Sequence, residues 1–341
     1  MVGRINTWTV RFLSYAGMLP LVQSVLTSIQ AFWTQIFLIP KKILQTIETM
    51  CKRFLWKGEA QSKGKALIAW DTLCWPKVAG GLNITDVYIW NKAAILKHLW
   101  NLAQKKDKLW IVWVHTYYIK GRRPWEVEGK QASWMVRKIM QAGQWIAEVG
   151  IPITEIMDAD EFTVKGMYKK LRGEFIKVPW RRLTCNNQGS PKWILLYLTI
   201  HRRLYTMDRL AKWGIHTDQV CALCKQERET HQHLFFSCNI AARIWRKLLQ
   251  WMCIIRNTAG WTEEMDWAVS HATGKATQDE VYRMTLAAAV YYVWQERNYR
   301  IFQKKERTAE VIIRSIIQEI YCRSSMQPKL AEFIRNFNYY P

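Results

Sequence analysis

The stretch CALCKQERETHQHLFFSC, residues 221–238, does most to decide how this chain folds. It spaces Cys221, Cys224, His233 and Cys238 as C-x2-C-x8-H-x4-C, so that four soft or borderline metal ligands fall within 18 residues. A C-x2-C turn lets two thiolates bind one Zn²⁺ at about 2.3 Å each, and a later histidine and cysteine can complete a closed tetrahedron. A closed site of this kind predicts a structural zinc ion and not a catalytic one.

Other interpretations of this stretch stay open on the sequence alone. The two cysteines of the C-x2-C turn could be ordinary small buried residues or a redox pair, and His231 competes with His233 as the imidazole ligand. We prefer His233 because it adjoins the apolar run at 234–236, which can anchor the site. A zinc deaminase is excluded, because no histidine has Glu two positions later and Val220 replaces the required proline.

Composition predicts a folded protein with a polyanionic partner. The chain has 341 residues, of which 50% are hydrophobic and 20 are tryptophan, and its formal net charge is +23. Acidic residues would serve solubility as well as basic ones, so this excess of cations favours a nucleic-acid partner. The eight cysteines are too sparse for a disulfide scaffold, and no apolar run is long enough to span a bilayer. We expect an intracellular protein, nuclear or cytoplasmic, with no membrane partner.

Apolar spacing predicts a mainly α-helical fold. Residues 1–56 indicate two helices separated by Pro40, whereas glycines and prolines in 57–83 indicate a hairpin or loop insert. We place the boundary between two halves in the polar stretch 151–191. Further helices are expected at Asp86 to Lys105, Ser133 to Val149, Asn239 to Cys253, Thr277 to Phe302 and from Thr308 onward, with Thr277 opening a capping box.

Basic residues are concentrated just before the cysteine turn. Residues 165–212 hold twelve Lys or Arg against two acids, a net charge of +10. Aromatic residues are interleaved with these cations from Trp193 to Trp213, and most of the aromatics are expected in the core. Cations neutralise phosphates and aromatic faces stack on unpaired bases. The predicted nucleic-acid contacts are Arg202, Arg203, Arg209, Lys212, Arg181 and Arg182.

Two sets of motifs resemble a known family. The first comprises LSYAG (13–17), FLWKG (54–58), GGL (80–82) and Trp90-Asn91; the second comprises LYTMDRL (204–210), CALC (221–224), Glu229-Thr230, HLFFSC (233–238) and WQERN (294–298). The first set resembles the thumb and following region of plant LINE-type, non-LTR retrotransposon reverse transcriptases. The second resembles the zinc-binding domain and closing helix of the same polymerases.

The resemblance implies a non-catalytic portion of such a polymerase. It would consist of a thumb-like helical region (1–56), a linker or connection region (57–150) and a zinc-binding region (160–325) that grips template RNA or target DNA. No Asp-Asp pair occurs in the sequence, so the family's palm carboxylates are missing, as are its fingers, endonuclease and any ribonuclease H domain. Met18 also stands where the family usually has Arg. We therefore expect no polymerase activity from this chain alone.

Two other functions remain possible on the sequence. The chain could be an accessory subunit that serves an active RNA-directed DNA polymerase in trans, with a reverse-transcriptase core as its partner. It could instead be a decayed or domesticated fragment that acts as a protein-interaction module. Salt-dependent affinity for nucleic acid would distinguish the nucleic-acid-binding functions from the protein-interaction module.

Overall fold

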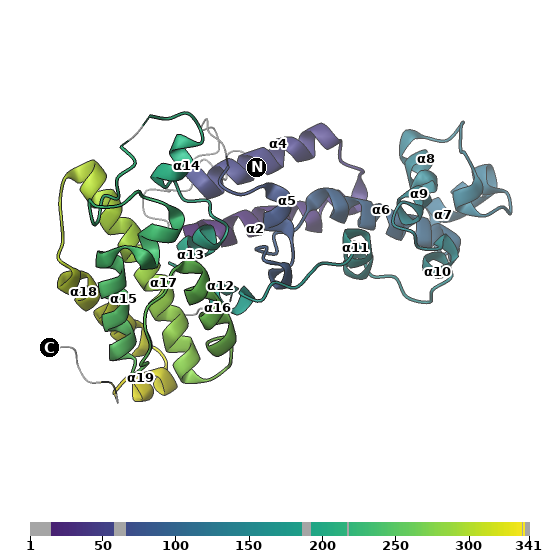
Figure 1. Ribbon diagram of the computed structural model, residues 1–341. Helices are drawn as coiled ribbons and strands as arrows, with labels where there is room; N and C mark the ends of the chain where they lie inside the picture. The colour runs from purple at the N-terminus through teal and green to yellow at the C-terminus, as the bar shows by residue number, and fades with distance from the viewer. Residues whose placement is uncertain (1–14, 58–65, 186–191, 217, 336, 338–341) are drawn as a thin grey trace. The chain divides into compact units, whose positions relative to one another are not determined.

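The computed structural model describes residues 15–57, 66–185, 192–216, 218–335 and 337. Helices make up nearly all of its regular structure (Figure 1). Among these described residues, the one strand-like pairing is an isolated antiparallel bridge between Val220 and Arg228. The mainly α-helical class predicted from the sequence is confirmed. The chain forms two compact units, one of Gly17–Pro76 with Gly81–Ile176 and one of Lys77–Gly80 with Lys177–Pro341.

The first unit is built on the long helix α6 (Val87–Ala103), against which α3, α8 and α11 pack. As predicted, the Asp86 side chain caps this helix by accepting a hydrogen bond from the Ile89 N–H at 3.0 Å. The other elements of the unit are α2 (Tyr15–Ala31), α3 (Trp33–Ile36), α4 (Lys41–Lys57), α5 (Trp70–Cys74), α7 (Leu109–Val114), the π-helix η3 (His115–Ile119), the 3-10 turn η4 (Pro124–Glu126), α8 (Trp134–Gln141), α9 (Gly143–Ala147), α10 (Ile153–Met157) and α11 (Val164–Arg172).

Asn91 joins α6 to the turn between α3 and α4. Its side chain is buried, donates to the carbonyls of Thr34 and Phe37 at 2.9 and 2.7 Å, and accepts from the Ile39 N–H at 2.8 Å. Backbone groups in a buried turn must find partners, and here one amide side chain supplies three of them. This explains structurally why Asn91 stands in the thumb-like motif.

Two local predictions in this part of the chain need correction. The 57–83 stretch was predicted to be a hairpin or a loop insert; its described residues, 66–83, form α5 and the 3-10 turn η2 (Lys77–Ala79) joined by loop residues, and no hairpin. A Cβ on Gly81 would lie 2.1 Å from the Trp75 carbonyl oxygen. The expected helix from Ser133 to Val149 is two helices, α8 and α9. Gly143 stands at the break, where an added Cβ would lie 2.4 Å from the Ile153 side chain.

The first unit extends to Ile176, within the stretch 151–191 where the sequence suggested a boundary. Residues 160–176, which the sequence analysis places in the zinc-binding region, pack in the first unit. Helix α11 lies against α6, and the Tyr168 hydroxyl accepts a hydrogen bond from the Asp86 N–H at 3.1 Å. An amphipathic helix joins whichever core buries its apolar face, and the sequence does not specify which core that is.

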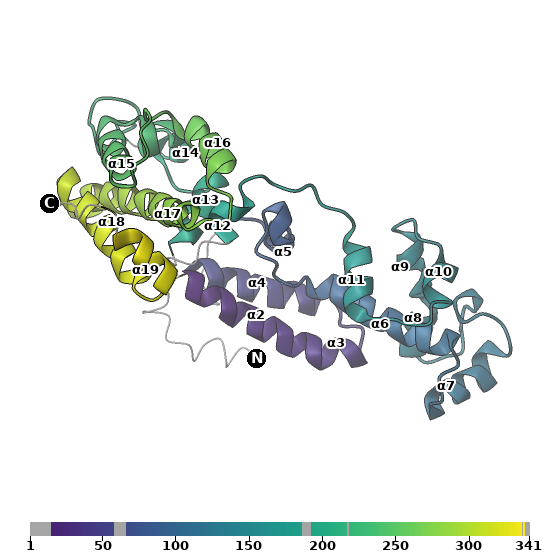
Figure 2. The ribbon, with the colours of Figure 1, turned by 90° about the horizontal axis from the view of Figure 1, so that it is seen from below.

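The second unit surrounds helix α17 (Thr277–Asn298), which packs against α13, α15, α18 and α19 (Figure 2). Ala276, and not Thr277, is the N-cap of α17, so the predicted capping box is one residue out of register. Thr308 does cap α18, by accepting from the Val311 N–H. The other elements are α12 (Arg181–Cys185), α13 (Trp193–Ile200), α14 (Met207–Ala211), the π-helix η5 (His233–Ser237), α15 (Asn239–Trp251), α16 (Trp261–His271), the π-helix η6 (Tyr299–Gln303), α18 (Ala309–Ser324) and α19 (Pro328–Arg335).

None of the helices in the described part of the chain combines the length and the apolar character that crossing a membrane would require.

Glu48, on α4, is held in an unfavourable environment inside the first unit. The pKa of its carboxyl is raised to about 7, mainly by burial and also by the nearby carboxylate of Asp86, while Lys52 acts in the opposite direction. The folded unit therefore binds a proton at Glu48 more tightly than the unfolded chain does. This contribution to stability is complete below about pH 4.5 and is lost as the pH rises through about 7.

We predict that Glu48→Gln stabilises the first unit at pH 8 but not at pH 4.5. The expected gain is about 1–2 kcal/mol, because the half-buried carboxylate keeps part of its hydration. Urea unfolding followed by circular dichroism at both pH values measures it. Glu174→Gln, at an exposed position of the same unit, is the control and should leave the pH dependence unchanged. Equal pH dependence in Glu48→Gln and the parent would contradict the prediction.

Candidate metal centre

Backbone hydrogen bonds fold the C-x2-C segment into a tight turn. The Lys225 N–H donates to the Cys221 carbonyl at 2.9 Å, and the Cys221 N–H donates to the Glu227 carbonyl at 2.8 Å. Lys225 itself takes a left-handed conformation, with φ of 57°, which reverses the chain. The turn places both thiols on one side, as a metal-binding knuckle requires.

A π-helical turn places the other two donors. The Cys238 N–H donates to the carbonyl of His233, five residues earlier, at 2.7 Å. This wider turn brings His233, at the start of η5, and Cys238, at its end, to the same side of the helix. The three apolar residues between them, Leu234, Phe235 and Phe236, are buried and anchor the turn in the core of the second unit.

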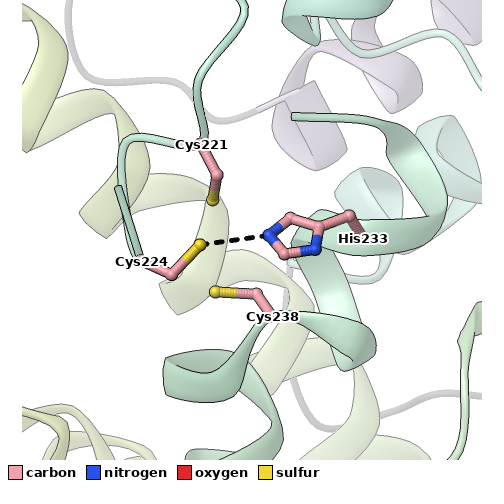
Figure 3. A group of neighbouring side chains, drawn as sticks. All are labelled: Cys221, Cys224, His233 and Cys238. Atoms are coloured by element: carbon pink, nitrogen blue, oxygen red, sulfur yellow. Dashed lines mark hydrogen bonds between the residues drawn. The ribbon is translucent and has the colours of Figure 1, made fainter. Parts of the chain in front are cut away.

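The four predicted ligands converge on one point (Figure 3). Donor atoms of Cys221, Cys224, His233 and Cys238 all lie within 4.8 Å of one another, and the Cys224 Sγ lies 3.3 Å from the His233 Nε2. Zinc bonds of about 2.3 Å to sulfur and 2.0 Å to nitrogen need donors separated by just such distances. The cluster is therefore positioned to hold a metal ion, and its three sulfurs and one imidazole nitrogen suit zinc.

A hydrogen bond between Cys221 and Cys238 shifts the pKa values of the two thiols in opposite directions. It lowers the pKa of the Cys238 thiol, and the backbone N–H groups of Ala241 and Ile240 lower it as well. The same hydrogen bond, together with burial, raises the pKa of Cys221. The two sulfurs are therefore in direct contact within the cluster.

His233 presents Nε2 to the thiols and has a carboxylate near its other nitrogen. Its Nδ1 lies 3.1 Å from Glu227 Oε2, although the two are not aligned as a hydrogen bond. Metal-binding histidines usually donate their second N–H to a carboxylate or carbonyl. The competing His231 is engaged elsewhere, because its Nε2 lies 2.8 Å from the Thr199 carbonyl oxygen and its ring packs on Trp261.

A buried ion pair joins the cysteine-rich segment to α17. Arg297 Nη2 lies 2.7 Å from Glu229 Oε1, and both side chains are almost fully buried. The same carboxylate accepts from the Met207 N–H at 3.0 Å, while Arg297 donates to the Tyr205 carbonyl at 3.2 Å. The pair therefore holds the 205–207 loop against the metal segment. The sequence showed both residues as motif positions but gave no role for them.

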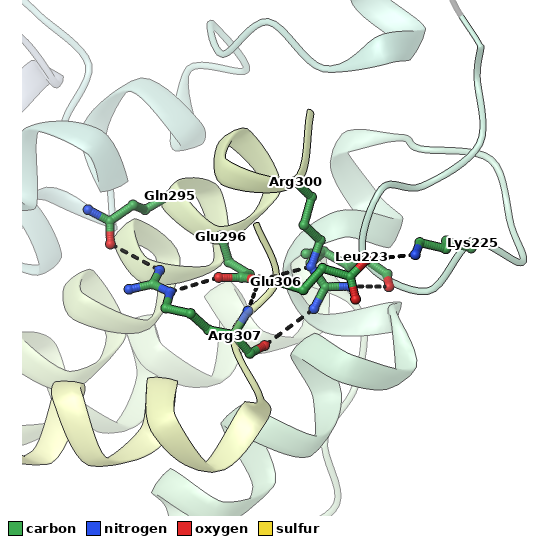
Figure 4. Close-up of polar contacts among 7 residues, drawn as sticks. All are labelled: Leu223, Lys225, Gln295, Glu296, Arg300, Glu306 and Arg307. Carbon is green, nitrogen blue, oxygen red and sulfur yellow. Dashed lines mark hydrogen bonds and ion pairs between the residues drawn. The ribbon is translucent and has the colours of Figure 1, made fainter. Parts of the chain in front are cut away.

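A second polar network, shown in Figure 4, holds the knuckle itself. Arg300 donates to the Leu223 carbonyl at 2.8 Å and pairs with Glu296 at 2.9 Å. Glu296 also accepts from the backbone and side chain of Arg307, each at 2.8 Å. Lys225, next to Cys224, pairs with Glu306 at 2.6 Å. The cysteine turn is therefore fixed from outside by the residues that follow α17.

The structure separates the predicted nucleic-acid contacts into two groups. Arg202, Arg203 and Lys212 are exposed, and Arg209 is partly exposed. Arg181 and Arg182 lie on α12 and are half-buried, and Arg182 donates to the Thr273 carbonyl. Arg202, Arg203 and Lys212 are exposed to a partner, whereas Arg182 is committed within the unit. Arg209 is partly engaged, because it donates to the Arg202 carbonyl at 3.2 Å.

We predict that the purified chain holds one zinc ion per molecule and that Cys221→Ser loses it. Structural zinc contributes roughly 10–16 kcal/mol to folding, comparable with the whole stability of a domain, so the second unit should unfold. Elemental analysis and thermal unfolding measure both effects. Cys322→Ser, at an exposed position outside the cluster, should keep the zinc. A folded parent protein without metal, indifferent to chelator, would refute the prediction.

We further predict that Arg297→Met lowers the free energy of unfolding by about 3–5 kcal/mol, because it leaves Glu229 buried without a cation. The double variant Glu229→Gln with Arg297→Met should recover part of that loss. Arg243→Met breaks the exposed pair with Glu310 and should cost under about 1 kcal/mol. Urea unfolding compares the three. Similar costs for Arg297→Met and Arg243→Met would show that the buried pair is not a structural tie.

Comparison with known proteins agrees with this geometry. Residues 162–245 match a family model described as zinc-binding in reverse transcriptase. Over 143 residues the chain is 31% identical to a protein of Arabidopsis thaliana named "Putative ribonuclease H protein", a match that covers 42% of this chain. The matched part is 22% of that relative's length, so the chain spans only a fraction of it. All four clustered donors lie within the matched segment, so the metal cluster falls in the part of the chain that is similar to the zinc-binding domain of reverse transcriptases.

Proposed function

We propose that this chain is the non-catalytic, nucleic-acid-binding C-terminal portion of a plant LINE-type reverse transcriptase, folded around a structural zinc ion. The observation that carries the proposal is an exposed surface of cations and aromatic rings beside the metal segment, which we name the 202–213 surface. It consists of Arg202, Arg203, Tyr205, Arg209, Lys212 and Trp213.

The 202–213 surface has the composition that binds single-stranded nucleic acid. Tyr205 and Trp213 expose 38% and 51% of their surface, with ring centroids 5.7 Å apart. The Arg209 guanidinium lies 4.8 Å from the Trp213 ring centroid. Stacked bases need exposed rings and phosphates need cations, and both are present here within twelve residues.

The metal segment supports this surface from behind. The Glu229 carboxylate accepts from the Met207 N–H, and its backbone carbonyl accepts from the Asp208 N–H at 3.3 Å. Arg297 donates to the Tyr205 carbonyl. The role of the zinc ion would be to fix the segment from which these contacts extend, so that the cations are presented in one arrangement.

The family match favours a role beside a polymerase. The matched domain is described by its zinc binding in reverse transcriptase, which supports a chain that positions template RNA or target DNA for a catalytic centre. The same match favours the second candidate function, an accessory subunit that acts in trans on a reverse-transcriptase core. The relative's ribonuclease H name rests on a protein of which this chain matches 22%, and we assign no such activity to the chain.

We predict that replacing Arg202, Arg203, Arg209 and Lys212 with Ala weakens binding to single-stranded RNA at every sequence tested and flattens its salt dependence. Each lost phosphate contact should reduce the slope of log affinity against log salt by about 0.7. Fluorescence anisotropy at several salt concentrations measures both. Zinc content should stay unchanged.

The matched control removes four other exposed cations of the same unit, Arg246, Lys247, Lys329 and Arg335. It lowers the net charge equally and should change affinity far less. Parent-like binding by the first variant at every salt concentration would refute the proposal and favour a protein-interaction module. Equal weakening by both variants would show only a general attraction between a basic protein and a polyanion.

A further inference from the structure

The first unit carries a helix whose exposed face is apolar and whose ends are basic. Helix α7 continues directly into η3, so that residues 109–119 form one helical rod. Ile111, Val114 and Ile119 face the core and are no more than 1% exposed. On the other side, Leu109, Val112, Trp113 and Tyr117 expose 88%, 54%, 45% and 61% of their surface.

These four exposed side chains lie on one face, because residues three, four and eight apart share a side of a helix. A helix that is apolar all round normally has both faces covered. Among the described residues of the first unit, nothing covers this face. An exposed apolar patch of this kind marks a site of contact with another molecule.

The charges at both ends of the rod indicate what that molecule is. Residues 105–123 hold six Lys or Arg and a single acid, Asp107, which gives a net charge of +5. The cations are Lys105, Lys106 and Lys108 before the rod and Lys120, Arg122 and Arg123 after it, all exposed. Within the described part of the chain, none of the six forms an ion pair with a carboxylate.

The backbone sets the limits of the rod. Lys108, just before it, is extended, with φ of −144°, and Lys120, just after it, is left-handed, with φ of 50°, followed by Gly121 at 81°. Residues other than glycine seldom adopt left-handed angles, so the chain departs sharply from helix at Lys120. The eleven-residue rod is about 16 Å long, which sets the separation of the two basic ends.

We propose that this 105–123 surface is a second binding site for single-stranded nucleic acid, in which bases stack on Trp113 and Tyr117 and the basic ends hold phosphates. It deepens the function proposed above and rests on it. The centroids of the two rings lie 5.6 Å apart. A packed aromatic pair beside exposed cations repeats the composition of the 202–213 surface. An acidic membrane is the less suited partner, because four apolar side chains on a short rod offer little area to bury in lipid.

The test uses the full chain and a fluorescein-labelled 20-nucleotide single-stranded RNA. Trp113→Ala with Tyr117→Ala should weaken binding at least about fivefold, since stacking contributes about 1–3 kcal/mol per base. It removes no charge, so the salt slope should stay at the parent value. Trp113→Phe with Tyr117→Phe keeps the rings and should retain most of the affinity.

Replacing Lys105, Lys108, Lys120 and Arg122 with Ala should instead flatten the slope of log affinity against log salt.

Trp134→Ala removes an exposed aromatic residue of the same unit that lies outside the 105–123 surface, and it should bind as the parent does. Urea unfolding checks that each variant is folded. Parent-like affinity of the Trp113→Ala, Tyr117→Ala variant would overturn the proposal. The proposal would also be overturned if the Trp113→Ala, Tyr117→Ala variant lost binding to phosphatidylserine vesicles but kept the RNA affinity of the parent.

The outcomes separate this site from the 202–213 surface. When Trp113→Ala with Tyr117→Ala is added to the variant lacking Arg202, Arg203, Arg209 and Lys212, affinity should fall further by a similar factor. One outcome would favour the 105–123 site alone: the variant lacking the four cations of the 202–213 surface binds RNA normally, while the Trp113→Ala, Tyr117→Ala variant does not. The 202–213 surface would then not be a binding site. If the parent binds no RNA at all, the proposed function itself fails.

Discussion

The second unit depends on the convergence of four donor atoms, three of them on buried side chains, contributed by two short segments that little regular structure connects. Three thiols and an imidazole collected in one buried place have little to offer each other beyond weak hydrogen bonds, as between Cys224 and His233. A bound cation would convert that poor contact into the strongest local interaction in the unit. The π-turn of η5 then has a clear physical reason, because an ordinary α-turn would not align residues five apart.

Around this cluster the protein uses charged side chains to fix backbone and not to react. Glu229 with Arg297, and Glu296 with Arg300 and Arg307, are buried or half-buried groups whose hydrogen bonds end on one another or on carbonyl and N–H groups. Removing one partner of such a pair lowers the free energy of unfolding, because the remaining charge stays buried without a counter-ion. These networks transmit the rigidity of the metal segment to the loop that carries Tyr205 and to the end of α17.

The two surfaces proposed to contact nucleic acid, 202–213 and 105–123, have the same composition of aromatic rings and cations. Each presents two aromatic rings in contact, more than a third exposed, with cations that form no ion pair among the described residues. Stacking tolerates any base sequence and phosphate contacts carry no sequence information, so such surfaces would hold single strands without reading them. That property would suit the proposed role of positioning template or target for chemistry performed by another centre.

The sequence by itself determined the helical class, the metal donors and the basic stretch before them, because each depends on local spacing. Cys221 to Cys238 span 18 residues, and Asp86 and Thr308 need only the next turn to act as caps. Tertiary structure alone decided that α11 belongs to the first unit, that the 66–83 segment contains the short helix α5 and no hairpin, and that Arg182 is used internally. It also revealed that Trp113 and Tyr117 are exposed while Ile111 and Val114 are buried. Both faces of that helix are apolar, so periodicity cannot say which one the core covers; that depends on packing between segments distant in the chain.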